Sequence, residues 1–415
     1  MQSYLCERRN QISDAMEDNS ILISYAGIPL HMNEDDYHDF MPNSQFFWLT
    51  GLSREKQVLV MAKMNQKVRT YLFIEERDEF NERWTGKMPT AQEVAEASGV
   101  DEDDVLYLED MNSIVGRMMS SYEITNAYFD VFRNDPEDMD DYNTLMAKRF
   151  QETYPDVRVK DLRKLVFTFR KTKDEKEIQQ VRRAIDITAN GLKEVLSKLK
   201  PGLKEYQVQA IFEGSCKYQG AKHFAFPTIS ASGINGCNMH YITNNDEVQD
   251  GDLILLDLGA KYGNYCSDIT RTYPANGKYS PRQREIYDLV LKANRAVAEA
   301  AKPGMTLREL NDLAKEILGQ GLVDMGMIDS VAEVGTYYMH SVSHSIGIDA
   351  HDVTLGNAVL EPGWIISDEP GIYIDEEGIG IRIEDDLLIT EDGCECLSEH
   401  IARDADEIEA IMAGR

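Results

Sequence analysis

The chain has 415 residues, of which 42% are hydrophobic and 28% charged, a composition typical of folded rather than disordered proteins. Its 43 basic and 73 acidic residues give a formal net charge of −30, which repels phosphate backbones and anionic lipids, so we expect no nucleic-acid or membrane partner. No apolar run approaches the roughly 18 residues of a membrane helix. The N-terminal segment also lacks the apolar stretch of a signal peptide, and the six cysteines form no CxxC pair, so we expect a cytoplasmic location.

Residues 1–165 are predicted to form an N-terminal α/β domain. Short β-rich runs at 57–62 and 69–75 alternate with helix-favouring stretches such as TAQEVAEASG. The acidic run EDMDD at 137–141 is interpreted as a solvated loop or helix face.

Residues 166–415 are predicted to form a second domain. It opens with a long amphipathic helix that stops at Lys200-Pro201-Gly202, because proline and glycine end helices. The elements expected after it are a helix at 204–219, strands at 226–273, helices at 281–325 and strands at 335–390. Since helices and strands do not strictly alternate, we predict an α+β fold with antiparallel pairing rather than a doubly wound parallel sheet.

The strongest local signal is DGDLILLDLGAKYGNYCSDITRTYP at 250–274, which reads as a hairpin. With a two-residue turn at Tyr262-Gly263, Asp257 and Asp268 face each other directly. Like charges in that position are destabilising unless they are neutralised, and a divalent cation is the simplest neutraliser. A turn longer by one residue would instead place the two aspartates on opposite faces, as ordinary strand-end residues. The hairpin alone favours neither interpretation.

Three histidines cluster in MHSVSHSIGIDAHD at 339–352, namely His340, His344 and His351. The first two have the spacing of the zinc motif HExxH, but Ser341 stands where that motif needs glutamate, so we reject a zincin.

Two further segments contribute carboxylates. Glu369 precedes a Pro-Gly turn in EPGWIISDEPGIYI, and period-two alternation in GIGIRIEDDLLIT places Arg382, Glu384 and Asp386 on one face of a strand. Together with the hairpin and one imidazole, these carboxylates suit a pair of Mn²⁺, Co²⁺ or similar ions better than a structural zinc. Two such ions can share a bridging water and lower its pKa.

The motifs LLDLGAKYGNYCSDITRT, HSVSHSIGIDAHD, DEPGIYI and GIGIRIEDD resemble those of the proline-specific "pita-bread" metallopeptidases, which include aminopeptidase P and prolidase. NSQFFWLTGL and NERWTGK resemble the non-catalytic domain of the same family. The resemblance implies a C-terminal pita-bread dinuclear metallopeptidase domain at 166–415. It also implies that the smaller domain at 1–165 shapes the substrate site and supports oligomerisation.

By this resemblance five residues bind the metal pair, and Asp268 and Glu384 bridge it; the five are Asp257, Asp268, His344, Glu369 and Glu384. Glu369 also serves as general acid/base. The remaining residues implied are His240 at the substrate or transition state, His351 for the intermediate and proton shuttling, His340 at the product-side pocket, and Arg382 orienting the carboxylates.

The implied activity is that of a metal-dependent Xaa-Pro aminopeptidase, which uses a metal-bridging hydroxide to release the residue before proline. The expected cofactors are two divalent ions, Mn²⁺ first, then Co²⁺ or Zn²⁺, and the expected assembly is a homodimer or homotetramer. Prolidase, which cleaves Xaa-Pro dipeptides, is the alternative, and a non-catalytic binding module of the same fold is a further one. The sequence departs from the family at Asp368, where a further acid stands next to Glu369, and Trp84 matches only weakly a tryptophan that a partner subunit contributes in aminopeptidase P.

Overall fold

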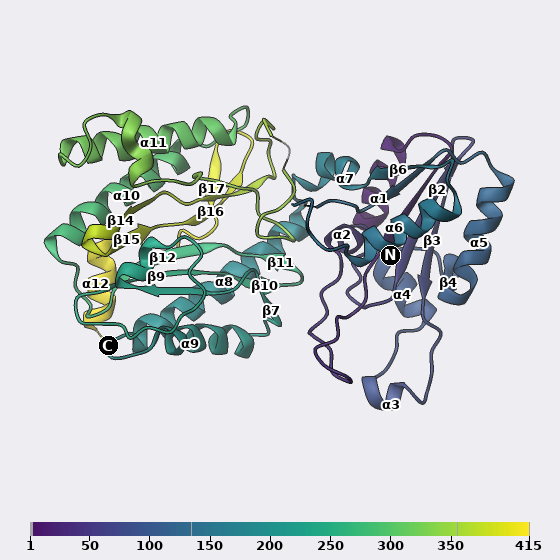
Figure 1. Ribbon diagram of the computed structural model, residues 1–415, viewed down its shortest axis with the longest axis horizontal. Helices are drawn as coiled ribbons and strands as arrows, with labels where there is room; N and C mark the ends of the chain where they lie inside the picture. Colours follow the sequence, from purple (N-terminus) through teal and green to yellow (C-terminus); the bar gives the residue numbers. More distant parts are fainter. Residues whose placement is uncertain (1–2, 134, 355, 415) are drawn as a thin grey trace. The chain divides into compact units, whose positions relative to one another are not determined.

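The computed structural model describes residues 3–133, 135–354 and 356–414. The chain divides into two units, Met1–Arg170 and Lys171–Arg415 (Figure 1). This division falls at the end of a helix, shortly after the boundary expected at residue 165. Among the described helices, none combines the length and the apolar character needed to cross a bilayer.

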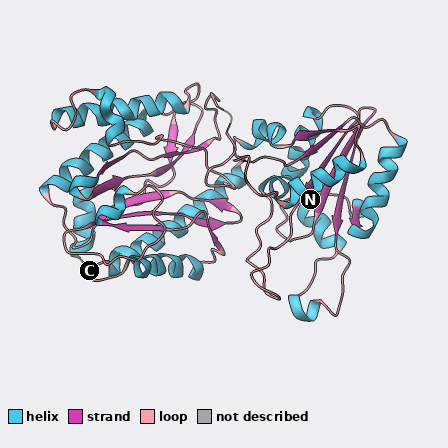
Figure 2. Ribbon diagram, in the orientation of Figure 1, coloured by secondary structure: helices cyan, strands magenta, loops and turns pink. Residues whose placement is uncertain are grey.

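A six-stranded mixed sheet with the order β4-β3-β2-β1-β5-β6 forms the centre of the N-terminal unit (Figure 2). The pairs β1–β2 and β2–β3 are antiparallel, and the other three neighbouring pairs are parallel. The strands expected at 57–62 and 69–75 are β2 and β3. The six strands are β1 (Ser20–Tyr25), β2 (Val58–Met64), β3 (Lys67–Ile74), β4 (Val105–Tyr107), β5 (Asn126–Phe129) and β6 (Arg158–Asp161).

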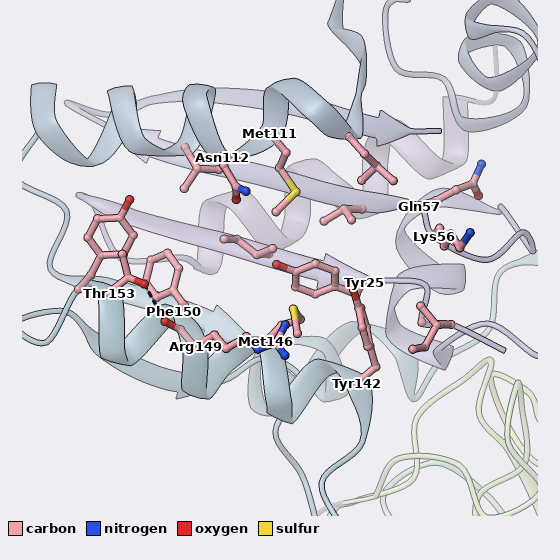
Figure 3. Close-up of a pocket in the computed structure, with 17 residues that line it drawn as sticks. Tyr25, Lys56, Gln57, Met111, Asn112, Tyr142, Met146, Arg149, Phe150 and Thr153 are labelled. Atoms are coloured by element: carbon pink, nitrogen blue, oxygen red, sulfur yellow. Dashed lines mark hydrogen bonds between the residues drawn. The ribbon is translucent and has the colours of Figure 1, made fainter. Parts of the chain in front are cut away.

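The helices of this unit are α1 (Ser3–Ala15), α2 (Ser44–Thr50), α3 (Glu82–Thr85), α4 (Ala91–Ser98), α5 (Leu108–Ser121), α6 (Tyr142–Thr153), α7 (Arg163–Arg170) and the short 3₁₀ helix η1 (Glu102–Asp104). Helices α5 and α6 cover one face of the sheet, where Ile21 and Ile23 pack with Val115 and Phe150. Between these two helices a groove of about 660 Å³ lies over β1, with Met111 among the side chains that line it (Figure 3).

The C-terminal unit begins with helix α8 (Glu175–Lys198), which is the long amphipathic helix predicted from the sequence. Asp174 caps it and forms a capping box with Glu177. Close packing on α9 requires Gly191, because a Cβ there would lie 2.6 Å from Phe212 Cδ2. The other helices are α9 (Glu205–Tyr218), α10 (Pro281–Ala300), α11 (Leu307–Asp324), α12 (Ala405–Ala413) and the 3₁₀ turns η2 (Gly233–Cys237), η3 (Val331–Thr336) and η4 (Asp375–Glu377).

Every strand pair in this unit is antiparallel among the residues described, as the sequence predicted. The sheets have the orders β12-β9-β8, β11-β10-β7, β13-β16-β17 and β14-β15. The strands are β7 (His223–Phe224), β8 (Ile229–Ser232), β9 (Leu253–Leu258), β10 (Ala260–Tyr262), β11 (Tyr265–Cys266), β12 (Ile269–Pro274), β13 (Ile365–Asp368), β14 (Gly371–Ile374), β15 (Ile379–Arg382), β16 (Asp385–Ile389) and β17 (Cys394–Cys396).

The register predicted for the central hairpin is wrong by two positions. The two-residue turn is Gly263-Asn264, and both residues have positive φ, 55° and 65°, as this tight turn requires. Asp257 therefore pairs with Thr270 rather than with Asp268. Because side chains alternate with period two, the shift leaves both aspartates on the same face. The alternative with a one-residue-longer turn, which would separate them, does not occur.

The sequence suggested one alternating strand at 378–390, and this prediction is wrong. The segment forms two strands with a break between them. β15 pairs with β14 in one sheet, whereas β16 pairs with β13 and β17 in another. At the break the backbone N–H of Glu384 donates to Thr270 O at 3.0 Å. This interruption places Glu384 beside the strand that follows Asp268.

Candidate metal centre

Five acidic and imidazole side chains from separate parts of the C-terminal unit lie together. Asp257 is near the end of β9, and Asp268 is in the link between β11 and β12. His344 precedes β13, Glu369 directly follows β13, and Glu384 lies between β15 and β16. Strand ends and breaks thus supply the four carboxylates, whereas His344 comes from the segment between η3 and β13.

The distances within this group leave room for a cation. Ligand atoms of Asp268, His344 and Glu384 all lie within 4.8 Å of one another. His344 Nε2 is 3.5 Å from Asp268 Oδ2, 3.4 Å from Glu369 Oε1 and 4.0 Å from Glu384 Oε1. These separations are too long for strong hydrogen bonds, but they fit atoms that each lie about 2.0–2.2 Å from one ion.

Asp257 and Glu369 extend the group beyond those three ligands. Asp257 Oδ2 accepts a 2.6 Å hydrogen bond from Arg382, while its Oδ1 is buried without a hydrogen-bond partner among the described residues. Glu369 Oε1 accepts only a long bond, 3.4 Å, from Ser367 Oγ. A buried carboxylate oxygen without a donor is costly, and a bound cation would satisfy it.

The electrostatics of the site show an excess of buried negative charge. Burial, and then the charge of Glu384, raises the pKa of Asp268 well above its ordinary value. Burial and then the charge of Glu369 do the same to the pKa of Glu384. For Glu369 itself, burial raises the pKa to about 7, with a further contribution from Asp257. Carboxylates that repel each other in a buried space form a site for hard cations, so this donor set fits divalent metal ions.

His340 and His344 are neutral near pH 7, and the neutral imidazole is the form that binds metals. Burial lowers the pKa of His340 and of His344 to about 4. His344 Nδ1 lies 3.2 Å from Ser345 O, so the ring presents Nε2 to the carboxylates. His351 packs edge-on against His344 with ring centroids 4.3 Å apart, and His240 is exposed and close enough to lower the pKa of His340 and His351.

Two side chains that the sequence analysis did not single out connect this group. Tyr373 Oη lies 2.8 Å from His340 Nε2 and accepts a 2.9 Å bond from Arg382 Nη1. Thr270 Oγ1 donates to Glu384 Oε2 at 2.7 Å. Thr270 lies on β12, two positions after Asp268, so the spacing alone could have identified it.

Asp368, the acid next to Glu369, points away from the cluster. It is fully buried, and its Oδ2 lies 3.3 Å from Asn294 Nδ2 on α10. Burial and then the charge of Asp385 raise its pKa well above the ordinary value. Asp385 forms a buried ion pair with Arg271 at 2.8 Å. This ion pair supports the backbone beside Glu384. Asp368 is therefore part of this supporting layer and not of the metal ligand set.

The chain is similar to known proteins over both of its units. The profile of metallopeptidase family M24 matches residues 179–391, and that of the aminopeptidase P N-terminal domain matches residues 5–128. The Xaa-Pro aminopeptidase of Escherichia coli (strain K12) is 33% identical, with 98% of this chain and 96% of that protein covered.

Solved structures resemble the chain over its whole length. A Bacillus anthracis protein provisionally described as an aminopeptidase P has a TM-score of 0.96 at 37% identity, covering 99% of this chain and 98% of that one. Zinc-substituted Escherichia coli aminopeptidase P in complex with product has a TM-score of 0.89 at 31% identity, covering 100% and 98%. The match to these proteins thus extends over both units of the chain.

Proposed function

The chain belongs to metallopeptidase family M24 and carries an aminopeptidase P N-terminal domain, and from this we propose that it is a metal-dependent Xaa-Pro aminopeptidase. It would release the N-terminal residue from peptides with proline in second position. The observation that carries the proposal is the buried group of Asp268, His344 and Glu384, whose ligand atoms lie within 4.8 Å of one another. Asp257 and Glu369 complete the proposed ligand set.

We propose that this set binds two divalent ions, with Mn²⁺ preferred and Co²⁺ or Zn²⁺ as substitutes. Four carboxylates and one imidazole form a mainly oxygen donor set, which favours such ions over a structural zinc with thiolate ligands. When bound, the ions supply a Lewis acid for the scissile carbonyl and an activated water. Asp268 and Glu384, which lie deepest, are the proposed bridging ligands.

Glu369 is the proposed general acid/base. Its carboxyl has a pKa raised to about 7 in the metal-free protein, and it lies at the edge of the group, 3.8 Å from His340. A group with a pKa near the working pH exchanges protons most effectively. Glu369 would accept a proton from the attacking water and deliver it to the proline nitrogen, which has no N–H of its own.

The remaining polar residues would bind and orient the substrate. His240 and His351 are exposed, and we propose that they contact the substrate carbonyl and stabilise the oxyanion. His340, held by Tyr373, would line the pocket for the leaving peptide. Arg382 fixes Asp257 with its 2.6 Å bond and keeps the carboxylates in position.

The test is hydrolysis of Arg-Pro-Pro compared with an Arg-Pro dipeptide, with Mn²⁺, Co²⁺ and Zn²⁺ added separately. We expect release of arginine from the tripeptide, fastest with Mn²⁺. Turnover of the dipeptide alone would make the protein a prolidase. Absence of turnover together with absence of bound metal would favour a non-catalytic binding module.

For the N-terminal unit we propose roles in shaping the substrate site and in forming a homodimer or homotetramer. Its large apolar side chains at Leu30, Phe80 and Trp84 are 71%, 67% and 78% exposed. Phe80 and Trp84 are four positions apart at helix α3, and their exposed apolar side chains are the proposed contact between copies of the chain. Light scattering of the full chain and of Trp84→Ala would test this, since a monomer in both cases contradicts an assembly. The six free thiols are consistent with work in a reducing compartment such as the cytoplasm.

A further inference from the structure

A buried ion pair fastens the loop that carries His351. Lys173 Nζ lies 3.0 Å from Asp352 Oδ2, and the two side chains are 1% and 0% exposed. Asp352 directly follows His351, whereas Lys173 precedes helix α8, far away in the sequence. A desolvated pair of this kind holds its geometry strictly, because moving either partner leaves a buried charge without its counterion.

Both partners are themselves anchored. The backbone N–H of Lys173 donates to Gly363 O at 2.7 Å, and its Nζ donates to Lys171 O at 3.0 Å. The backbone N–H of Asp352 donates to Ser345 O at 2.8 Å, which closes residues 345–352 into a compact loop. The ion pair is therefore a fixed point, and the loop is tied to it at the residue next to His351.

Gly347 is the residue that allows this arrangement. A Cβ at Gly347 would lie 2.1 Å from Asp352 Oδ2 and 2.9 Å from Lys173 Cε, so no other residue fits against the pair. The carbonyl of Gly347 accepts a 2.8 Å bond from Cys266 N, two residues before Asp268. The ion pair, the loop and the hairpin of the metal centre form one packed unit.

His351 depends on this unit for its position. Its side chain is exposed and packs edge-on against the ring of His344. We propose that Lys173 and Asp352 are positioning residues, which hold His351 over the metal centre for catalysis. This rests on the role proposed above for His351. Misplacing a reacting group by about 1 Å can cost a hundredfold in rate.

The first experiment is a double-mutant cycle between Asp352→Asn and His351→Ala in the metal-loaded full-length enzyme. We expect Asp352→Asn to lower kcat about tenfold or more, with KM changed much less, because the substrate still binds but meets a displaced imidazole. In the His351→Ala background Asp352→Asn should have no further effect. An equal loss in both backgrounds, or an unchanged kcat in the single variant, overturns the proposal.

His351→Ala by itself tests the catalytic role proposed for His351 separately from the positioning role proposed for Lys173 and Asp352. If that variant keeps the wild-type kcat, the role assigned to His351 fails, and the positioning proposal is overturned with it at this earlier step. If the wild type hydrolyses no Xaa-Pro peptide, the proposed function fails. The imidazole NMR signals of the metal-free protein then decide the positioning separately. We expect those of His351 to shift and broaden in Asp352→Asn, and unchanged signals overturn the proposal.

A neutral pair distinguishes positioning from stability. Lys173→Met and Asp352→Asn each leave one buried charge, whereas the double variant leaves none, so its melting temperature should recover. The kcat of the double variant should stay low if the pair positions His351. Recovery of kcat together with stability would mean a purely structural role. Arg182→Met is the control, because it breaks an exposed ion pair between Arg182 on α8 and Glu395 on β17 and should leave kcat unchanged.

Discussion

Arg382 donates a 2.6 Å hydrogen bond to Asp257, and among the described residues no other lysine or arginine forms an ion pair with the four clustered carboxylates. Burial, together with the repulsion among four carboxylates that one guanidinium cannot balance, raises the pKa values of Asp268 and Glu384. The missing positive charge is what a metal would provide. The metal-free fold therefore stores electrostatic repulsion that ligation relieves.

Asp257→Asn and Glu384→Gln should each remove activity mainly through loss of metal. Each substitution keeps the side-chain shape but replaces an anionic ligand by a weak neutral one, so we expect metal affinity to fall about a hundredfold or more. Metal content after dialysis, measured by mass spectrometry, checks this. Glu376→Gln, an exposed residue of η4, is the control and should keep wild-type metal content. Full metal occupancy in Glu384→Gln would contradict the ligand assignment.

Glu369→Gln should separate metal binding from proton transfer. The amide oxygen can still occupy a ligand position, but it cannot carry a proton at neutral pH. We expect some metal to remain, while kcat falls about 10²–10⁴-fold. The measurement is kcat at saturating Mn²⁺ with metal content determined on the same sample. A metal-replete variant with wild-type turnover would exclude Glu369 as the acid/base.

Metal binding should release protons. In the metal-free protein the raised pKa of Glu369, about 7, keeps its carboxyl partly protonated near neutral pH, and ligation needs the carboxylate. Affinity should thus rise with pH through about 7. Titration calorimetry in two buffers with different ionisation enthalpies measures the protons released. Identical heats in both buffers at about pH 6 would contradict the expectation.

The same pKa shift determines how the stability of the metal-free protein depends on pH. The folded-state pKa of Glu369 lies above its unfolded-state value, so its contribution to stability is complete below the unfolded pKa of about 4.3 and is lost as pH rises through about 7. The melting temperature gained on adding metal should therefore grow over this range. Thermal unfolding with and without Mn²⁺ across the range checks it. A metal-induced gain in melting temperature that shrinks with rising pH would contradict this prediction.

Tyr373→Phe should affect catalysis more than stability. The lost hydroxyl bonds both His340 and Arg382, so both side chains gain freedom at the site. We expect kcat/KM to fall about tenfold, with a stability cost of about 1 kcal/mol. Tyr287→Phe is the matched control, since it removes a buried bond to Arg403 O at similar cost. Equal kinetic effects in the two variants would argue against a specific role for Tyr373.

The sequence indicated which residues carry the site more reliably than how they meet. The hairpin sequence left open whether Asp257 and Asp268 share one face. They do, with the turn displaced by one residue from the turn considered. Asn264 tolerates the left-handed conformation that the turn requires, and this local preference decided the register. The break at Glu384 was not visible in an unbroken run of apolar and acidic residues, because it depends on pairing with Thr270 in another sheet. The supporting bonds of Tyr373 likewise depend on tertiary contacts.

Two glycines give opposite expectations for stability. At Gly380 on β15 an added Cβ would lie 2.0 Å from Gly236 O and 2.8 Å from Cys237 N, both rigid backbone atoms. Gly380→Ala should therefore push β15 away and cost about 1–3 kcal/mol or more, and because Arg382 lies on the same strand, activity should fall as well. Gly214 lies exposed in α9 with nothing within 4 Å of an added Cβ. Gly214→Ala should stabilise the helix by up to about 1 kcal/mol and leave kcat unchanged. Urea unfolding of both variants measures the difference, and a stable, fully active Gly380→Ala enzyme would show that β15 and η2 are not in close contact.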